Sequence, residues 1–348
     1  MGQTWGSMSY IKEIALKNYR SFVDARCRLS PFTLIVGANN AGKSNLLKAV
    51  EDFSKWWCDF DFDDLFGTQW IVTRHHAAKE GEADVSLSWS DGTRTETRSS
   101  PTIVMGGLRQ VGNESNPLRT PIPIFRFDPE LIGRPEEKTG KVGLSAVGSG
   151  VSATLDQWNA GVKANRDRFA RVVAELSRCI PEIEAISFFD DDKGRRGIQV
   201  EQSGIPKAVP LSEVSEGTRI VLAILTLLNL ETPPPVMLIE DIDRGLHPRL
   251  YEKLVEFLRS VTMSGRTQIV ATTHNPYLLD EFEDMPEAVV VVEKKDGAST
   301  LSNLDERLRA ILKPGAELEM PLGELWFSGS LGGVPGMKLP DLINPRAA

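Results

Sequence analysis

Apolar and polar positions change their period early in the chain, from a strand pattern to a helical one. Residues 9–17 and 32–36 have the pattern of strands, and residues 43–57 repeat their apolar positions at helical spacing. A glycine-rich turn at 37–44 separates the second strand from the helix. The chain therefore begins with strand, glycine-rich turn and helix, which is the local context of a phosphate-binding loop.

The second half of the chain alternates regularly between helices and strands, which indicates a largely parallel sheet. The pattern predicts helices at 216–230, 248–262 and 276–283, and strands at 236–240, 267–272 and 288–293. Between the two halves the pattern is less regular. It predicts short strands at 83–89 and 121–127, a helix at 153–179, and strands at 185–189 and 198–201 around a hairpin tip, DDDKGRRG.

Composition limits the class of protein. The 348 residues are 41% apolar and 25% charged, which is typical of a globular chain and excludes general disorder. The net charge of −8 disfavours a histone-like binder of nucleic acid, although a local basic patch remains compatible with it. No apolar run approaches the roughly 20 residues of a membrane span, and the N-terminus lacks the pattern of a secretory signal. We expect a soluble, cytoplasmic protein.

Cysteine and histidine spacing gives no metal motif. Cys27, Cys58 and Cys179 are far apart and form no C-x-x-C pair, and the adjacent His75 and His76 lie in a polar stretch. We expect buried thiols in a reducing compartment and surface histidines.

The strongest chemical signal is GANNAGKS at 37–44, which fits the pattern G-x-x-x-x-G-K-[ST]. Glycines allow successive backbone N–H groups to point at phosphate oxygens, and the helix N-terminus adds its dipole. In this arrangement Lys43 neutralises the β- and γ-phosphates of a nucleotide, and the Ser44 hydroxyl binds Mg²⁺.

Three further segments place polar residues after apolar strands or at a helix start. PVMLIEDID, at 235–243, describes a buried strand that ends in carboxylates, which can hold Mg²⁺ and orient water. IVATTHNP, at 269–276, brings Thr273 and His274 to a strand end. In LSEVSEGTRI, at 211–220, Ser215 is either an ordinary helix cap or an anion-binding group.

These four motifs in this order resemble the ATP-binding-cassette (ABC) ATPase heads of the RecF/SMC type, and more narrowly the stand-alone AAA family ATPases related to the overcoming-lysogenization-defect (OLD) nucleases. Two further elements carry the likeness, N-Y-R-S-F at 18–22 and D-R-G-L-H-P at 243–248. The resemblance implies an α/β fold with a mainly parallel P-loop sheet, an antiparallel N-terminal β lobe and a helical or irregular insertion. It also implies ATP and Mg²⁺ as ligands and a head-to-tail homodimer around ATP.

The resemblance also assigns site residues. The nucleotide-binding residues it implies are Arg20, Gly37, Asn39, Asn40, Ala41, Gly42, Lys43, Ser44, Asn45, Ser215 and Gly217. Catalysis falls to Glu240, Asp241 and the switch histidine His274, with Ser44 and Glu240 as ligands of Mg²⁺. Relatives end this strand with Asp-Glu, whereas this chain has Glu240-Asp241, so the acid order is swapped. Position assigns Mg²⁺ to Glu240 and the attacking water to Asp241. The shorter Asp241 side chain predicts slow ATP hydrolysis.

We expect a single head over 1–293, divided into 1–57 with the phosphate loop, an inserted lobe at 58–184 and a half at 185–293 with the other motifs. Residues 294–348 form an extension that packs on the head or docks a partner. They are too few for the Toprim nuclease domain of OLD proteins, so a nuclease would be a separate chain.

Three functions are compatible with these motifs. The first is an ATPase that controls a separately encoded effector, such as a nuclease or toxin, in a bacterial anti-phage or toxin system. The second is a RecF-like DNA-repair ATPase, for which the arginines of 166–171 and the basic residues of 193–196 are the candidate DNA contacts. The third is a transporter ATPase, which ranks last because L-S-G-G-Q is missing and 172 residues separate Lys43 from Ser215. We expect no membrane partner.

Overall fold

The computed structural model describes residues 10–57, 121–312, 318 and 320–332, and also 84–90 and 95–99; at 56–57 and in those two strands the description is limited to the backbone. The chain forms two compact units, each described here by itself. The first contains Met1–Pro123, Val236–Leu238 and Gln268–Ala348, and the second contains Ile124–Pro235 and Ile239–Thr267. Within the described ranges, no helix is both long and apolar enough to cross a bilayer.

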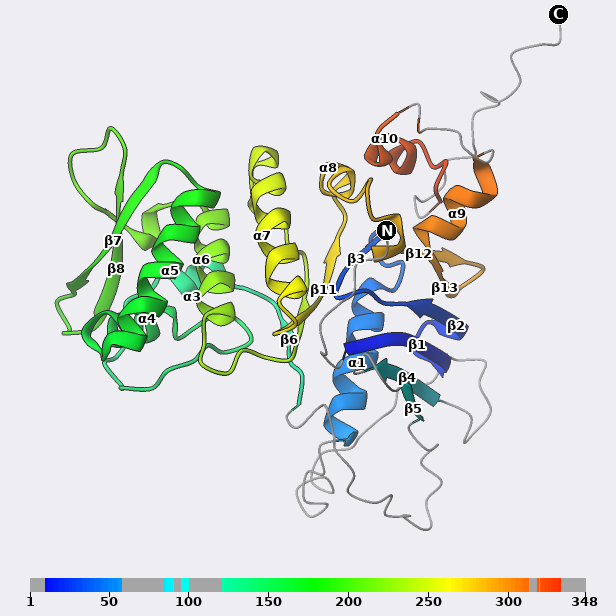
Figure 1. The fold of residues 1–348 in the computed structure, drawn as a ribbon, viewed down its shortest axis with the longest axis horizontal. Coiled ribbons are helices and arrows are strands. Elements are labelled where there is room, and N and C mark those ends of the chain that lie inside the picture. The colour runs from blue at the N-terminus through cyan, green and yellow to red at the C-terminus, as the bar shows by residue number, and fades with distance from the viewer. Residues whose placement is uncertain are drawn as a thin grey trace, which may run out of the picture. The chain divides into compact units, whose positions relative to one another are not determined.

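The first unit is built on a sheet with the strand order β5-β4-β1-β2-β13-β12-β3-β11-β10 (Figure 1). The bounds are β1 Tyr10–Tyr19, β2 Phe22–Arg28, β3 Phe32–Gly37, β4 Asp84–Ser90, β5 Thr95–Ser99, β10 Val236–Ile239, β11 Gln268–Thr273, β12 Val289–Lys295 and β13 Ala298–Asn303. Its helices are α1 Lys43–Trp57, α8 Pro276–Asp280, η3 Pro286–Ala288, α9 Leu304–Ile311 and α10 Leu322–Phe327.

Strand direction divides this sheet into a parallel centre and an antiparallel N-terminal part. β3 pairs in parallel with β11 and with β12. β1 pairs in antiparallel fashion with β2 and β4, and β4 with β5. Every residue of β3 and β11 is buried, as expected for parallel strands covered on both faces. The predicted α/β fold, with a parallel P-loop sheet and an antiparallel N-terminal lobe, is confirmed.

Helix α1 covers the central strands because its apolar residues form one stripe. Leu46, Leu47, Val50 and Phe53 recur at helical spacing and are buried, and α1 contacts β3 and β11. The opposite side of α1 carries a ladder of charges in which Glu51 binds Lys48 (2.6 Å) and Lys55 (2.9 Å).

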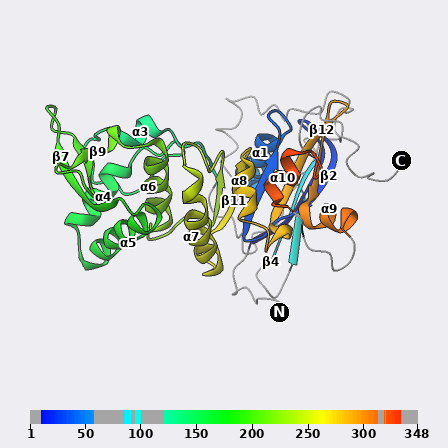
Figure 2. The same ribbon diagram turned by 90° about the horizontal axis from the view of Figure 1, so that it is seen from above.

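The second unit packs helices around one apolar helix, α6, beside a small antiparallel sheet in the order β7-β8-β9 (Figure 2). Its elements are β6 Ile124–Phe125, α3 Pro129–Gly133, α4 Val151–Ala160, α5 Lys163–Cys179, β7 Ile183–Asp190, β8 Arg196–Gln202, β9 Val209–Pro210, η1 Leu211–Glu213, α6 Glu216–Leu228, η2 Pro248–Leu250 and α7 Tyr251–Met263. After Glu216 every residue of α6 is buried, and α3, α4 and α5 contact this helix.

The predicted elements of the second half exist, with ends that differ by a few residues, and three expectations need correction. The helix predicted at 153–179 is two helices, because the chain is extended at Gly161 and Val162. The strand predicted at 121–127 is limited to β6, since the N–H groups of Arg126 and Asp128 donate to a loop at Ala146 and Val147 instead. The helix predicted at 248–262 begins with the 3-10 turn η2 before α7.

The two cysteines among the described residues agree with the expectation of buried thiols. Cys27 and Cys179 are buried and unpaired with each other. Burial raises the pKa of Cys179 to about 11, and nearby Glu175 adds to this shift. Cys58, His75 and His76 lie outside the described residues.

The C-terminal helix α10 packs on α8. Leu322, Gly323 and Trp326 share one buried face. The Gly323 N–H donates to Asp280 Oδ1 (2.7 Å), and a Cβ at Gly323 would lie 2.4 Å from the Pro276 carbonyl oxygen. The apolar pattern of this segment predicts burial of Phe327 as well, and that expectation is wrong. Phe327 is 64% exposed because it follows Trp326 around the helix, away from the buried face.

This packing can be tested with two truncations on α10. Leu322→Ala removes a side chain that is 0% exposed, so we expect a loss of about 2–5 kcal/mol in the free energy of unfolding. Phe327→Ala, the matched control, should change it by less than about 0.5 kcal/mol. Urea unfolding followed by circular dichroism measures both, and equal effects would contradict the packing.

Candidate nucleotide-binding and hydrolysis site

The phosphate loop connects β3 to α1 in the first unit and has the geometry that its glycines predict. Gly42 has a φ of +122°, and a Cβ there would lie 2.6 Å from Ser299 Oγ and 3.1 Å from Ser21 Oγ. A side chain at this position is therefore excluded by backbone conformation and by space. Asn40 also has a positive φ, of 62°, which asparagine tolerates better than other side chains.

Lys43 lies inside this loop. Its side chain is 9% exposed, and Nζ donates to the carbonyl oxygens of Gly37 (2.7 Å) and Ala38 (3.1 Å). Carbonyl oxygens are neutral acceptors, whereas a phosphate oxygen is charged and forms a stronger hydrogen bond to an ammonium group. The N–H groups of the first turn of α1 carry the positive end of the helix dipole. The donors of this loop therefore fit a nucleotide phosphate.

The other predicted loop residues divide into exposed and anchored ones. Asn39, Asn40 and Ser44 are exposed, so their polar groups are accessible to a ligand. Asn45 is anchored, because its Nδ2 donates to Ser21 Oγ (2.8 Å). Ala41 is buried, and its carbonyl oxygen accepts from Ser299.

Ser299, at the start of β13, was not predicted and fixes the loop from the opposite side. Its hydroxyl donates to the Ala41 carbonyl (2.5 Å), and its N–H donates to the Ser21 carbonyl (2.7 Å). The side chain is 1% exposed. Two loops that are far apart in sequence thereby hold one another, and no local pattern could have indicated this.

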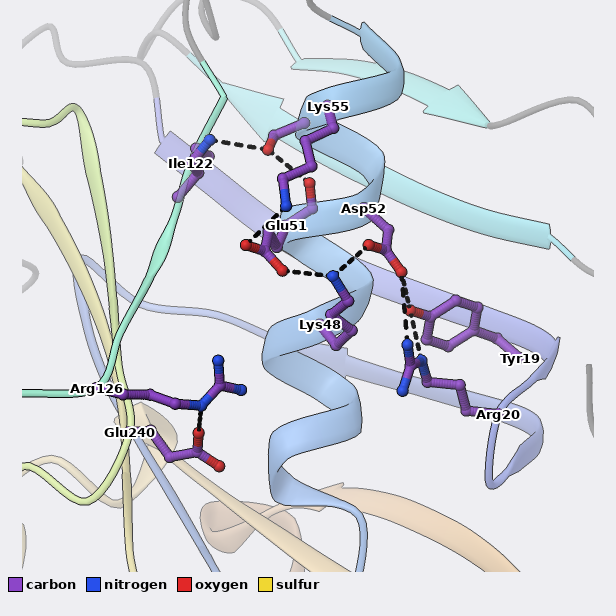
Figure 3. Close-up of polar contacts among 10 residues, drawn as sticks. Tyr19, Arg20, Lys48, Glu51, Asp52, Lys55, Ile122, Arg126 and Glu240 are labelled. Carbon is purple, nitrogen blue, oxygen red and sulfur yellow. Dashed lines mark hydrogen bonds and ion pairs between the residues drawn. The ribbon is translucent and has the colours of Figure 1, made fainter. Parts of the chain in front are cut away.

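Arg20 lies in the turn between β1 and β2, close to α1 (Figure 3). It has a φ of 49°, its Nε donates to Tyr19 Oη (3.1 Å), and Tyr19 Oη donates to Asp52 Oδ2 (2.7 Å). Burial, followed by the charge of Asp52, raises the pKa of Tyr19 well above its usual value. Lys48 Nζ binds the other oxygen of Asp52 (2.8 Å). These contacts hold the Arg20 turn against the helix that carries the phosphate loop.

His274 lies at the same edge of the sheet as the phosphate loop. Thr273, the last residue of β11, pairs with Val36 of β3, so His274 and Gly37 follow the two strands side by side. His274 is exposed. Asn275 caps α8 by accepting from the Tyr277 N–H (3.0 Å), which fixes the backbone directly after the histidine.

Glu240 and Asp241 follow β10, whose residues are all buried. In the second unit, the Glu240 N–H donates to the Phe125 carbonyl (2.9 Å), and its carboxylate forms an ion pair with Arg126 Nε (Figure 3). Asp241 has a φ of 50°, an uncommon conformation for a residue other than glycine. Sequence reasoning missed Arg126, although a charged residue at the end of a short apolar strand was a usable signal.

Ser215 caps α6, also in the second unit. Its Oγ accepts from the Thr218 N–H (3.2 Å) and lies 2.8 Å from Thr218 Oγ1, and Ser215 is exposed. Gly217 is buried, and a Cβ there would lie 2.6 Å from the Gly245 carbonyl oxygen. The structure therefore brings the SEGT segment together with the D-R-G-L-H-P segment.

The arginines among the candidate DNA contacts already have partners within the chain. Arg195 binds Asp191 (2.7 Å), and Arg196 binds acidic residues of its own hairpin and of α4 at 3.0 Å. On α5, Arg166 donates to the Gly161 carbonyl (2.7 Å).

Family models match two parts of the sequence. Residues 9–83 match the model described as "AAA ATPase domain". Residues 137–280 match the model described as "AAA domain, putative AbiEii toxin, Type IV TA system". No curated protein matches the sequence.

Solved structures of SMC heads resemble the fold. An SMC head bound to the C-winged helix domain of ScpA has 15% identity and a TM-score of 0.52, covering 86% of this chain and 99% of that chain. An SMC head with an extended coiled coil, bound to the C-terminal domain of ScpA and derived from Pyrococcus furiosus, has 12% identity and a TM-score of 0.53, covering 87% and 99%.

The fold and the phosphate loop define an SMC-like, ABC-type ATPase head. With its matches to AAA ATPase models, the chain is an ATP-hydrolysing enzyme.

Ser299 gives a test of how the loop is held. Ser299→Ala removes the hydrogen bond to Ala41, so we expect ATP affinity to fall about three- to tenfold, as one net hydrogen bond contributes about 1 kcal/mol. Thr300→Ala, at the exposed neighbouring position of β13, is the control and should bind ATP as the wild type does. Isothermal titration measures both, and equal affinities in the two variants would contradict the role of Ser299.

Proposed function

We propose that this ATPase dimerises head-to-tail around Mg²⁺–ATP and controls a separately encoded effector, a toxin or nuclease, in a bacterial anti-phage or toxin system. The observation that carries the dimer is Ser215. It is exposed at the N-terminus of a 13-residue helix, where the dipole and a hydroxyl both favour an anion. The resemblance found in the sequence implies that this segment binds the γ-phosphate of the ATP held by the partner protomer.

Two features support control of an effector. The family model that matches 137–280 is described as a putative AbiEii toxin of a type IV TA system. The two similar SMC heads are each bound to a domain of a separate protein, ScpA. A head that docks a second protein is the arrangement we propose here, and the OLD-like motif order agrees with an anti-phage setting.

The residues that would serve Mg²⁺ fit that ion chemically. Mg²⁺ prefers oxygen ligands, which the Ser44 hydroxyl and the Glu240 carboxylate supply. The Glu240 carboxylate already binds one cation, the guanidinium of Arg126, so Mg²⁺ would have to displace it from the shared oxygens. When bound, Mg²⁺ neutralises phosphate charge.

Asp241 orients the attacking water in this proposal, and His274 contacts the transferred phosphate from the end of β11. Asp241 is about 1.5 Å shorter than a glutamate, roughly one carbon–carbon bond. A misplacement of that order lowers the rate by about a hundredfold. Slow turnover suits a switch that stays loaded with ATP until it is triggered.

The alternative, a RecF-like DNA-binding ATPase, has less support. Direct contact with phosphates needs accessible cations, and Arg195 and Arg196 are paired with acids of their own unit. Among the residues that the structure describes, no observation favours DNA over a protein effector.

The assignment of the two acids predicts opposite phenotypes. Asp241→Asn should keep Mg²⁺–ATP affinity and lose turnover by at least about a hundredfold, because the water is no longer oriented. Glu240→Gln should instead raise the Mg²⁺ concentration needed for ATP binding. Phosphate release and nucleotide titration over a range of Mg²⁺ measure the two effects, and the reverse pattern would contradict the assignment.

Dimerisation has a separate test. Ser215→Arg should leave nucleotide binding intact, abolish turnover, and prevent the increase in mass that a slowly hydrolysed ATP analogue causes in the wild type. Ser212→Arg, at an exposed position of η1, is the control for an added arginine. Analytical ultracentrifugation measures the mass, and an equal mass of wild type and Ser215→Arg with the analogue would refute the shared site.

A further inference from the structure

The carboxylate of Glu240 is held by a short strand that continues into a capped helix. Phe125 binds the Glu240 backbone, and the next residue, Arg126, binds its side chain through Nε. Arg126 is itself fixed, because its N–H donates to the Ala146 carbonyl (2.9 Å). The stacked rings of Phe125 and Phe127, with centroids 5.7 Å apart, lie on either side of it in sequence and are buried.

The far end of this strand segment is anchored as firmly. Asp128 caps α3 by accepting from the Glu130 N–H (2.9 Å). Arg219 of α6 donates to the Pro129 carbonyl (3.0 Å) and binds Glu130 (3.0 Å). These contacts hold the backbone on both sides of Arg126, so rotation of its side chain is a way to separate the pair that breaks none of them.

The two side chains of the pair differ in exposure. Arg126 is 54% exposed and Glu240 is 18% exposed. Figure 3 shows the Nη groups of Arg126 directed away from the Glu240 carboxylate. The guanidinium can therefore turn into solvent without opening the core, while the carboxylate stays in place. A cation that is retained on a carboxylate competes with any other cation for the same oxygens.

We propose that Arg126 is a positioning residue that holds the Glu240 carboxylate in the nucleotide-free protein and is displaced from it by Mg²⁺. The ion pair then sets how much Mg²⁺ the enzyme needs. This inference rests on the proposed assignment of Glu240 to Mg²⁺, but not on dimerisation or on an effector. It gives Arg126 no direct part in the chemistry.

The test is the Mg²⁺ dependence of binding of a fluorescent ATP analogue. Arg126→Gln removes the competing charge, so the half-saturating Mg²⁺ concentration should fall about two- to fivefold, the range of a partly exposed ion pair. Arg126→Lys keeps a cation and should restore the wild-type value. Arg134→Gln removes a charge from the same segment, at the end of α3, and should leave the value unchanged. On the Glu240→Gln background, Arg126→Gln should have no further effect.

A second readout uses no nucleotide. Mg²⁺ alone should raise the melting temperature of Arg126→Gln more than that of the wild type. If circular dichroism shows that Arg126→Gln is unfolded, Arg126→Met keeps the aliphatic stem and replaces it in both measurements.

The outcomes separate this inference from the proposed function. An unchanged or higher Mg²⁺ requirement in the neutral variant, beside a Mg²⁺-dependent wild type, overturns the role of Arg126 alone. Binding by the wild type that is independent of Mg²⁺ overturns the assignment of Glu240 as well. Loss of self-association in the ultracentrifuge, with the expected Mg²⁺ shift intact, overturns the dimer and leaves Arg126 in its role.

Discussion

Burial of the parallel strands on both faces is the constraint that decides where this protein can do chemistry. β3 and β11 have no exposed residue, and an uncompensated charge inside such a strand would be destabilising by several kcal/mol. Charged side chains are therefore kept out of β3 and β11 and lie beyond the ends of these strands. Gly37 and His274 follow neighbouring strands there, and Glu240 follows the buried β10. The position of these motifs at strand ends is the consequence of this geometry.

The strand ends alone do not give the phosphate loop its shape. Gly42 fits because the space a side chain would need is filled by Ser299 and Ser21. Ser299 follows the β12–β13 turn, and Ser21 belongs to the turn between β1 and β2, yet the backbones of the two serines are hydrogen-bonded. The loop is thus stabilised by the antiparallel part of the sheet, which is a structural reason for the N-terminal strands to accompany the parallel centre.

The parts of the fold that can be predicted from sequence are those that a local pattern of residues determines. The apolar runs of β3, β10 and β11 and the glycine spacing of the phosphate loop are local, and the structure confirms those strands and that loop geometry. β13 was missed because its sequence, ASTLSN, is polar and its pairing with β12 stabilises it. Arg126 and Glu240 are 114 residues apart, so their contact depends on strand pairing that no sequence window contains. The apolar residues keep a helical spacing on both sides of Gly161, so the pattern predicts one helix. The extended backbone at Gly161 ends the first helix, and the spacing does not show this.

The backbone directly after β10 orients Glu240 and Asp241, the two acids whose order is swapped. Consecutive side chains of an extended strand point to opposite faces. Glu240 is still bonded to β6 through its N–H, so its direction is set by strand pairing. Asp241 has left that pattern with a φ of 50°, and its direction is set by the turn that its carbonyl forms with the Arg244 N–H (3.0 Å). Two adjacent carboxylates that are oriented by different hydrogen bonds can serve different partners. The backbone thus orients the two acids by separate hydrogen bonds, whatever the length of their side chains.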